Sequence, residues 1–107
     1  MSADLNMKVL VVDDYVTMIR IIKNLLTQIG FQNIIDAKDG QEAIERLNEN
    51  QVGLIISDWN MEPMSGLELL KHVRATQNLA HIPFIMVTAE SKTENYYKKE
   101  RRNAWHH

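Results

Sequence analysis

The sequence predicts a doubly wound α/β fold, in which parallel strands alternate with helices. Three observations indicate this fold class: short β-branched runs that suit buried strands, apolar residues that recur with the helical period between these runs, and the regular alternation of the two patterns. Parallel strands are joined by right-handed helical crossovers, so the helices should cover the sheet in layers. With 107 residues, the chain fits a single domain spanning residues 1–107.

The first half of the chain should contain three strands and two helices. Residues 8–12 form a β-branched run, and residues 15–29 carry apolar side chains at the helical period, with Gly30 as a stop. Residues 33–36 and 54–57 are expected to be strands, separated by a helix over residues 39–50. The side chains of this second helix that should face inward are Ala43, Ile44 and Leu47.

A capping box opens the third helix. Ser65 and Glu68 stand three residues apart, and the helix that they begin carries Leu67, Leu70 and Val73. This spacing predicts an amphipathic helix after the third strand.

The last predicted strand covers residues 82–87 and has Pro83 near its start, a position that a strand tolerates. A second capping box, Ser91 with Glu94, predicts a fourth helix after it.

Composition excludes several classes of function. The net charge of −2 and the sequence pI near 6.0 give no positive field for nucleic acid or for a membrane surface, so neither is an expected partner. The chain has no cysteine, no signal peptide and no apolar run of the roughly 20 residues that cross a bilayer. A cytoplasmic protein is therefore expected.

Polar residues, three of them aspartates, follow the predicted strands. Asp13 and Asp14 follow the first strand, Asp58 follows the third, and Thr88 follows the fourth. In open parallel sheets, ligands bind at the carboxyl ends of the strands, and these carboxylates would repel one another unless a cation lay among them. Oxygen ligands of this kind suit Mg²⁺, with Mn²⁺ as an alternative.

Asp58 is the candidate nucleophile of this site. A carboxylate beside a divalent metal can attack phosphorus in line, and the Thr88 hydroxyl could hydrogen-bond the transferred phosphoryl group. Each residue also has an ordinary explanation, because a pair of aspartates often caps a helix, and a strand-end Asp or Thr is often a turn residue. Their joint placement after strands one, three and four favours the functional interpretation.

The motifs that carry this chemistry resemble those of two-component response-regulator receiver domains. They are Val11-Val12-Asp13-Asp14, Ile56-Ser57-Asp58-Trp59-Asn60-Met61, Met64-Ser65-Gly66 and Val87-Thr88-Ala89-Glu90. The resemblance implies that Asp58 accepts a phosphoryl group from a histidine kinase and that Asp13 and Asp14 position magnesium. Asp14 and Asp58 would be direct ligands, together with the backbone carbonyl of Asn60, and Thr88 would be the switch hydroxyl.

The resemblance also implies a flavodoxin-like sheet and a signalling role rather than an enzyme classification. Trp59 is similar to the tryptophan of the single-domain chemotaxis regulators. Residues 90–95 look like the start of the family's fourth helix, which in those regulators is part of the surface that meets the flagellar motor switch. The resemblance therefore implies the motor switch as a candidate output partner.

Residues 96–107 form an atypical tail, because they show no apolar strand and no Lys-Pro pair where receivers continue with a fifth strand and helix. We therefore expect an incomplete sheet of four strands in the order 2-1-3-4, with strand four as an exposed edge and helix one partly uncovered. This predicts a homodimer or a domain-swapped oligomer.

An alternative function is a receiver-like scaffold that cannot switch and self-associates through strand four. A phosphohydrolase is weaker, since the Asp-x-Asp pattern and a cap over the site are missing.

Overall fold

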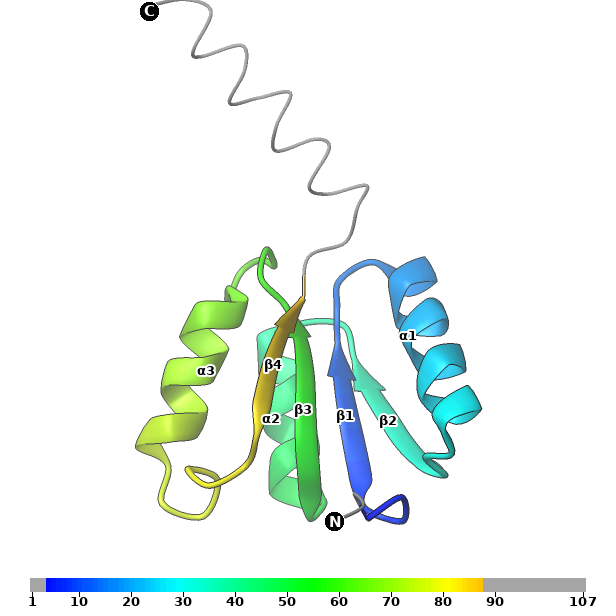
Figure 1. Cartoon of the computed structure of the whole chain (residues 1–107). Helices are drawn as coiled ribbons and strands as arrows, with labels where there is room; N and C mark the ends of the chain where they lie inside the picture. The colour runs from blue at the N-terminus through cyan, green and yellow to red at the C-terminus, as the bar shows by residue number, and fades with distance from the viewer. Residues whose placement is uncertain (1–3, 88–107) are drawn as a thin grey trace, which may run out of the picture.

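The computed structural model describes residues 4–87, which form a parallel sheet with helices on both faces (Figure 1). The elements in chain order are β1 (Lys8–Val12), α1 (Val16–Ile29), β2 (Asn33–Ala37), α2 (Gly40–Glu49), β3 (Val52–Asp58), α3 (Gly66–Ala75) and β4 (Phe84–Val87). All neighbouring strands are parallel, and their order is β2-β1-β3-β4. The predicted flavodoxin-like order 2-1-3-4 is confirmed for the described part of the chain.

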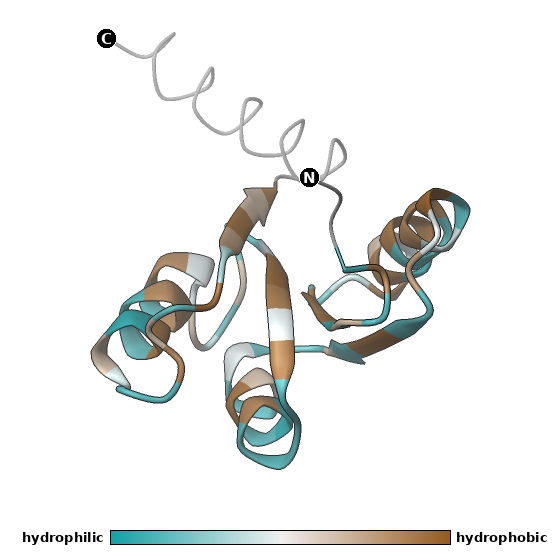
Figure 2. Ribbon diagram, turned by 60° about the horizontal axis from the view of Figure 1, so that its bottom comes forward, coloured by the Kyte–Doolittle hydropathy of each residue, from teal (hydrophilic) through white to brown (hydrophobic). Residues whose placement is uncertain are grey.

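Two apolar layers hold the sheet between its helices. Because successive strand residues point to opposite faces, Val9 and Val11 of β1 pack in the layer under α1, whereas Leu10 and Val12 pack in the layer under α2 and α3. Most residues of the strands are hydrophobic (Figure 2), as is typical of a parallel sheet that is covered on both sides. The carboxyl ends of β1 and β3 therefore lie on a rigid, buried support.

The starts of two strands differ from the prediction. β3 begins at Val52, two residues earlier than expected, because the strand continues through Gly53. β4 begins at Phe84, later than expected, because the N–H of Ile82 donates to the carbonyl of Leu79 in the preceding turn. Ile82 is nevertheless 3% exposed, so it serves the core from the loop rather than from the strand.

Helix α3 begins at the predicted capping box. The Ser65 N–H donates to the Glu68 carboxylate at 2.9 Å, and the Glu68 N–H donates to the Ser65 hydroxyl oxygen at 3.1 Å. The backbone and side-chain hydrogen bonds with Ser65 lower the pKa of Glu68 below its usual value of 4.5. The expected apolar face was wrong at Leu67, which is exposed. Leu69 is buried in its place, because it lies one turn before Val73 on the side of the helix that faces the sheet.

Helix α1 leaves part of its apolar surface uncovered. Its N-terminal cap is Tyr15, and its last turn ends at Gly30, whose φ of 121° lies in the region that favours glycine. Among residues 4–87, no element covers Leu25 and Ile29, which are 53% and 64% exposed, as expected for helix one. Ile85 on β4 is also exposed, and in the described sheet β4 pairs only with β3.

Several predictions concern residues 88–107, which lie outside the described part of the chain. They are the position of Thr88, the capping box of Ser91 and Glu94, the helix over residues 90–95 and the tail over residues 96–107. Within the described residues, no helix has both the length and the hydropathy that crossing a membrane requires.

Candidate functional site

Three carboxylates meet at the carboxyl ends of β1 and β3. Asp13 and Asp14 directly follow β1, and Asp58 is the last residue of β3. The two strands are neighbours, with Val12 opposite Ser57, so Asp13 and Asp58 occupy the next position along adjacent strands. One ligand oxygen from each aspartate lies within 4.8 Å of the others. The sequence prediction that these side chains converge is confirmed.

Burial differs among the three aspartates. Asp13 and Asp58 are fully buried, whereas Asp14 is exposed. The cluster thus has a floor of buried carboxylates and a solvent-facing edge, through which a hydrated cation can enter. The donor set consists of oxygen atoms, which is the chemistry that Mg²⁺ prefers, so the residues fit a magnesium site.

Asp13 is fixed by its backbone and by its side chain. Its N–H donates to the carbonyl of Ala37 at the end of β2, at 3.1 Å, and its Oδ1 accepts from the N–H of Tyr15 at 2.9 Å. These bonds tie Asp13 to β2 on one side and to the start of α1 on the other. Its carboxylate is therefore held in place before any ligand binds.

The loop after Asp58 is tied to β4 and to α3. The N–H of Trp59 donates to the carbonyl of Val87, and the N–H of Gly66 donates to the carbonyl of Trp59, both at 3.0 Å. Trp59 is 48% exposed, and Asn60 beside it is also exposed. The residue directly after Asp58 thus carries an exposed indole ring. Sequence reasoning gave Gly66 no role of its own, although it lies within a motif that was recognised.

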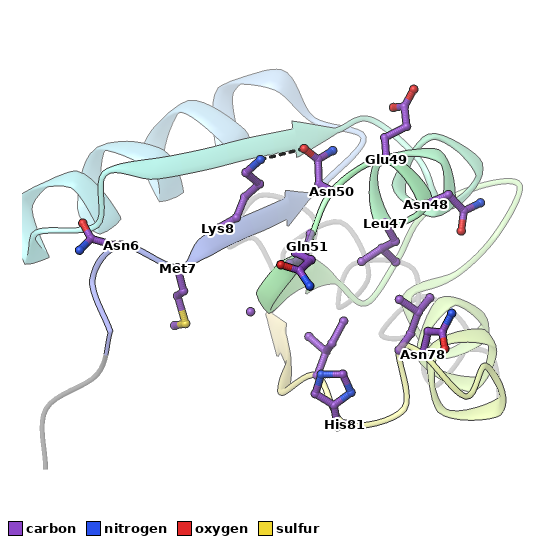
Figure 3. Close-up of a pocket in the computed structure, with 14 residues that line it drawn as sticks. Asn6, Met7, Lys8, Leu47, Asn48, Glu49, Asn50, Gln51, Asn78 and His81 are labelled. Atoms are coloured by element: carbon purple, nitrogen blue, oxygen red, sulfur yellow. Dashed lines mark hydrogen bonds between the residues drawn. The ribbon is translucent and has the colours of Figure 1, made fainter.

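The structure also contains a hollow that is separate from the acidic cluster. It has a volume of about 810 Å³ and is lined by the first residues of β1 and β3, the end of α2 and the loop before β4 (Figure 3). Lys8 Nζ donates to Asn50 Oδ1 across its rim at 2.8 Å. Because the aspartates follow the opposite ends of the same strands, this hollow is not part of the candidate site.

The fold and the cluster together define a class of protein: a flavodoxin-like α/β domain with a cluster of three aspartates at the carboxyl ends of its central strands. The sequence profile of the response regulator receiver domain matches residues 9–106. The chain belongs to this family, which places it among the phosphoryl-accepting receivers of two-component signal transduction.

Known relatives agree with this assignment. Chemotaxis protein CheY-3 of Vibrio cholerae is 48% identical over 89 residues, which cover 83% of this chain and 68% of the relative. Chemotaxis protein CheY of Pseudomonas aeruginosa is 49% identical over 88 residues, covering 82% and 71% of the two chains. Among solved structures, the N-terminal domain of a response regulator receiver protein from Methanoculleus marisnigri superposes with a TM-score of 0.73 at 33% identity, covering 78% and 68% of the two chains. Vibrio cholerae CheY4 superposes with a TM-score of 0.71 at 32% identity, covering 83% and 76%.

Proposed function

We propose that Asp58 is the phosphoryl acceptor of this receiver and that a histidine kinase is the donor. The observation that carries the proposal is the position of Asp58 at the end of β3, with its carboxylate in one cluster with Asp13 and Asp14. An Asp58 oxygen attacks phosphorus, the phosphorus–nitrogen bond of a phosphohistidine breaks, and the leaving ring nitrogen keeps the electron pair.

The same cluster would hold the magnesium ion. Asp14 and Asp58 would supply direct ligands, with the carbonyl of Asn60, and Asp13 would orient the bound ion and its waters. When bound, Mg²⁺ neutralises the charge on the phosphoryl oxygens and on the three carboxylates. The Thr88 hydroxyl, which follows β4 in the chain, would hydrogen-bond the phosphoryl group after transfer. Mn²⁺ has the same ligand preference and should replace Mg²⁺.

The assignment of Asp58 is tested by incubating the protein with acetyl phosphate and Mg²⁺, followed by intact-mass measurement. The wild-type protein should gain one phosphoryl group, and chelation of the metal should prevent this. Asp58→Asn should gain none, whereas Asp36→Asn, which changes a carboxylate on β2 that pairs with Lys23 at 2.8 Å, should react like the wild type. Equal phosphorylation of Asp58→Asn at another residue would refute the assignment.

A second measurement uses the Trp59 ring. Mg²⁺ should quench its fluorescence, and beryllofluoride, which mimics a phosphoryl group on aspartate, should change it further and saturably. Trp105→Phe removes the other tryptophan of the chain, so that the signal comes from Trp59 alone. A beryllofluoride response that survives in Asp58→Asn would show that the ligand binds elsewhere.

We further propose chemotaxis as the pathway and the flagellar motor switch as the output partner, acting in the cytoplasm. The support is the identity of 48% and 49% to two relatives that are named chemotaxis proteins. Expression in a motile strain that lacks its own regulator tests this proposal. Restored swimming reversals, lost again with Asp58→Asn, are the expected result. No effect on swimming at normal protein levels would point to another output.

The exposed apolar residues favour a second candidate role, self-association as a homodimer or a domain-swapped oligomer. Leu25, Ile29 and Ile85 are all about half exposed or more, and each would gain by burial against another copy. As a scaffold, the protein would associate whether or not Asp58 is phosphorylated. Light scattering at high concentration, with and without beryllofluoride, separates the two roles. A monodisperse monomer under both conditions would exclude the scaffold.

A further inference from the structure

Gly66 begins α3 at a point where the helix lies directly against the end of β3. A Cβ atom built on Gly66 would overlap the carbonyl oxygen of Asp58 and would lie 3.1 Å from the carbonyl carbon of the same residue. It would also lie 3.0 Å from Met86 Sδ. The methionine is flexible and could move, but the Asp58 carbonyl is main chain. Any larger residue at position 66 must therefore displace backbone.

The end of β3 is held from several sides against such a displacement. β3 lies between β1 and β4, and Asp58 stands opposite Val87 in the β3–β4 pair. The Asp58 carbonyl accepts a hydrogen bond from the buried Ser57 hydroxyl at 3.0 Å. The N–H of Trp59 continues the ladder to Val87.

The start of α3 is held as well. The capping box of Ser65 and Glu68 satisfies the first turn of the helix, and Leu69 and Val73 are fully buried beneath it. Neither the helix nor the strand can move without losing these contacts. The strain of a side chain at position 66 therefore falls on Asp58 and on the loop over residues 59–65.

A second glycine packs against the same loop, near Met64. A Cβ atom on Gly40, the first residue of α2, would lie 2.5 Å from Met64 Sδ and 2.8 Å from both Met64 Cβ and Met64 Cγ. Because the contact reaches Met64 Cβ, a rotation of the side chain cannot fully relieve it. The loop is thus closely packed against α3 at Gly66 and against α2 at Gly40.

We infer that Gly66 and Gly40 are positioning residues for the acceptor site. They hold residues 59–65 so that the Asp58 carboxylate and the Asn60 carbonyl lie beside the carboxylates of Asp13 and Asp14. Neither glycine touches a reacting atom; each acts by allowing a close approach of main chain. The inference rests on the proposed function of Asp58. Its physical basis is that a displacement on the order of 1 Å at a reacting group can lower a rate by about 100-fold.

The test compares Gly66→Ala with Gly53→Ala. Both variants add one methyl group, but Gly53 lies at the other end of β3, where the added atom would meet Met7 Sδ at 2.9 Å and Met7 Cβ at 3.0 Å. The readouts are the rate of Mg²⁺-dependent acyl phosphate formation from acetyl phosphate and the Mg²⁺ affinity from Trp59 fluorescence. Circular dichroism and thermal unfolding report whether each variant is folded.

Gly66→Ala should remain helical, because alanine favours a helix more than glycine does. It should nevertheless react roughly 10- to 100-fold more slowly and bind Mg²⁺ several-fold more weakly, whereas Gly53→Ala should keep both values near those of the wild type. A merely structural role of Gly66 would change the unfolding temperature but not these two readouts. Wild-type values in folded Gly66→Ala, or equal losses in the two variants, would overturn the inference.

If Gly66→Ala does not fold, the contact between Gly40 and Met64 decides. In the wild-type background, Gly40→Ala should weaken Mg²⁺ binding and slow the reaction. In the Met64→Gly background the clash is gone, so the double variant should bind Mg²⁺ and react as Met64→Gly alone does. Absence of recovery in a folded double variant would overturn the inference. A wild-type protein that forms no acyl phosphate would instead count against the proposed function, so the two failures are distinct.

Discussion

Replacing Asp13 by asparagine removes one negative charge from the acidic cluster and leaves its shape almost unchanged. The side chain is fully buried, and its Oδ1 accepts the Tyr15 N–H at 2.9 Å, a bond that an asparagine oxygen can also accept. The exchange should therefore report the electrostatics of the cluster rather than a cavity or the loss of the Tyr15 hydrogen bond. We expect Asp13→Asn to be more stable than the wild type when no divalent metal is present.

The size of the effect follows from the separation of the carboxylates. At 4.8 Å and an effective dielectric constant near 20, two ionised carboxylates repel by about 3.5 kcal/mol. Asp14 is exposed, so water reduces its share of the repulsion toward about 1 kcal/mol. The buried pair of Asp13 and Asp58 keeps more of it. After allowance for screening, a gain of about 1–3 kcal/mol is expected, and each kcal/mol corresponds to roughly 4–8 °C in Tm for a domain of this size.

Magnesium should narrow this difference in stability between Asp13→Asn and the wild type. A ligand at ten times its Kd stabilises the folded state by about 1.4 kcal/mol, and this gain should be larger for the wild type than for Asp13→Asn. Thermal unfolding in EDTA and over a Mg²⁺ series measures both effects, with Glu45→Gln on the exposed surface of α2 as the control for net charge. A variant Asp13→Asn that is less stable than the wild type in EDTA would contradict repulsion within the cluster. Equal stabilisation of both proteins by Mg²⁺ would contradict a role of Asp13 in metal binding.

Further predictions test the core, the cap of α3 and the uncovered surface. In urea titrations, Leu69→Ala should lower the free energy of unfolding by about 2–5 kcal/mol and Leu67→Ala by less than about 1 kcal/mol, because only Leu69 is buried. Similar losses in the two variants would contradict the packing of the Leu69 face of α3 against the sheet. Ser65→Ala should cost about 1 kcal/mol of stability. The pKa of Glu68 is lowered in the folded state, so the stabilisation by its carboxylate is present above pH 4.5 and is lost as the pH falls through the folded pKa. The stability difference between the wild type and Glu68→Ala should therefore shrink below pH 4.5. A difference that grows there would contradict the capping assignment. Leu25→Gln should reduce the apparent mass in light scattering at high concentration if α1 joins two copies, and an unchanged mass would exclude that surface.

The order of the elements could be predicted because local signals agree with one another. Gly30 stops the first helix, Ser65 and Glu68 open the third, and the β-branched run at residues 8–12 forms a strand. Each signal acts within a few residues and does not depend on distant contacts. The convergence of Asp13 and Asp58 was also predictable, since parallel strands place their carboxyl ends at one edge of the sheet.

Which apolar side chains point toward the core was harder to predict where several of them are close together in the sequence. The stretch from Leu67 to Leu70 contains three leucines, so the helical period alone allows more than one inward face. Packing against the sheet decides between them and buries Leu69. In the same way, the sequence placed Asp13 and Asp14 together after β1, and only the tertiary structure showed that the first is buried and the second exposed.

The sequence by itself determined the fold class, the strand order expected of its family and the residues of the acidic cluster, because these follow from periodicity, caps and motifs along the chain. Only the tertiary structure decided how closely α3 approaches the Asp58 carbonyl at Gly66 and which apolar residues of α1 remain uncovered. Both depend on distances between elements that are far apart in the sequence. Such distances result from the packing of the whole domain, which no local pattern specifies.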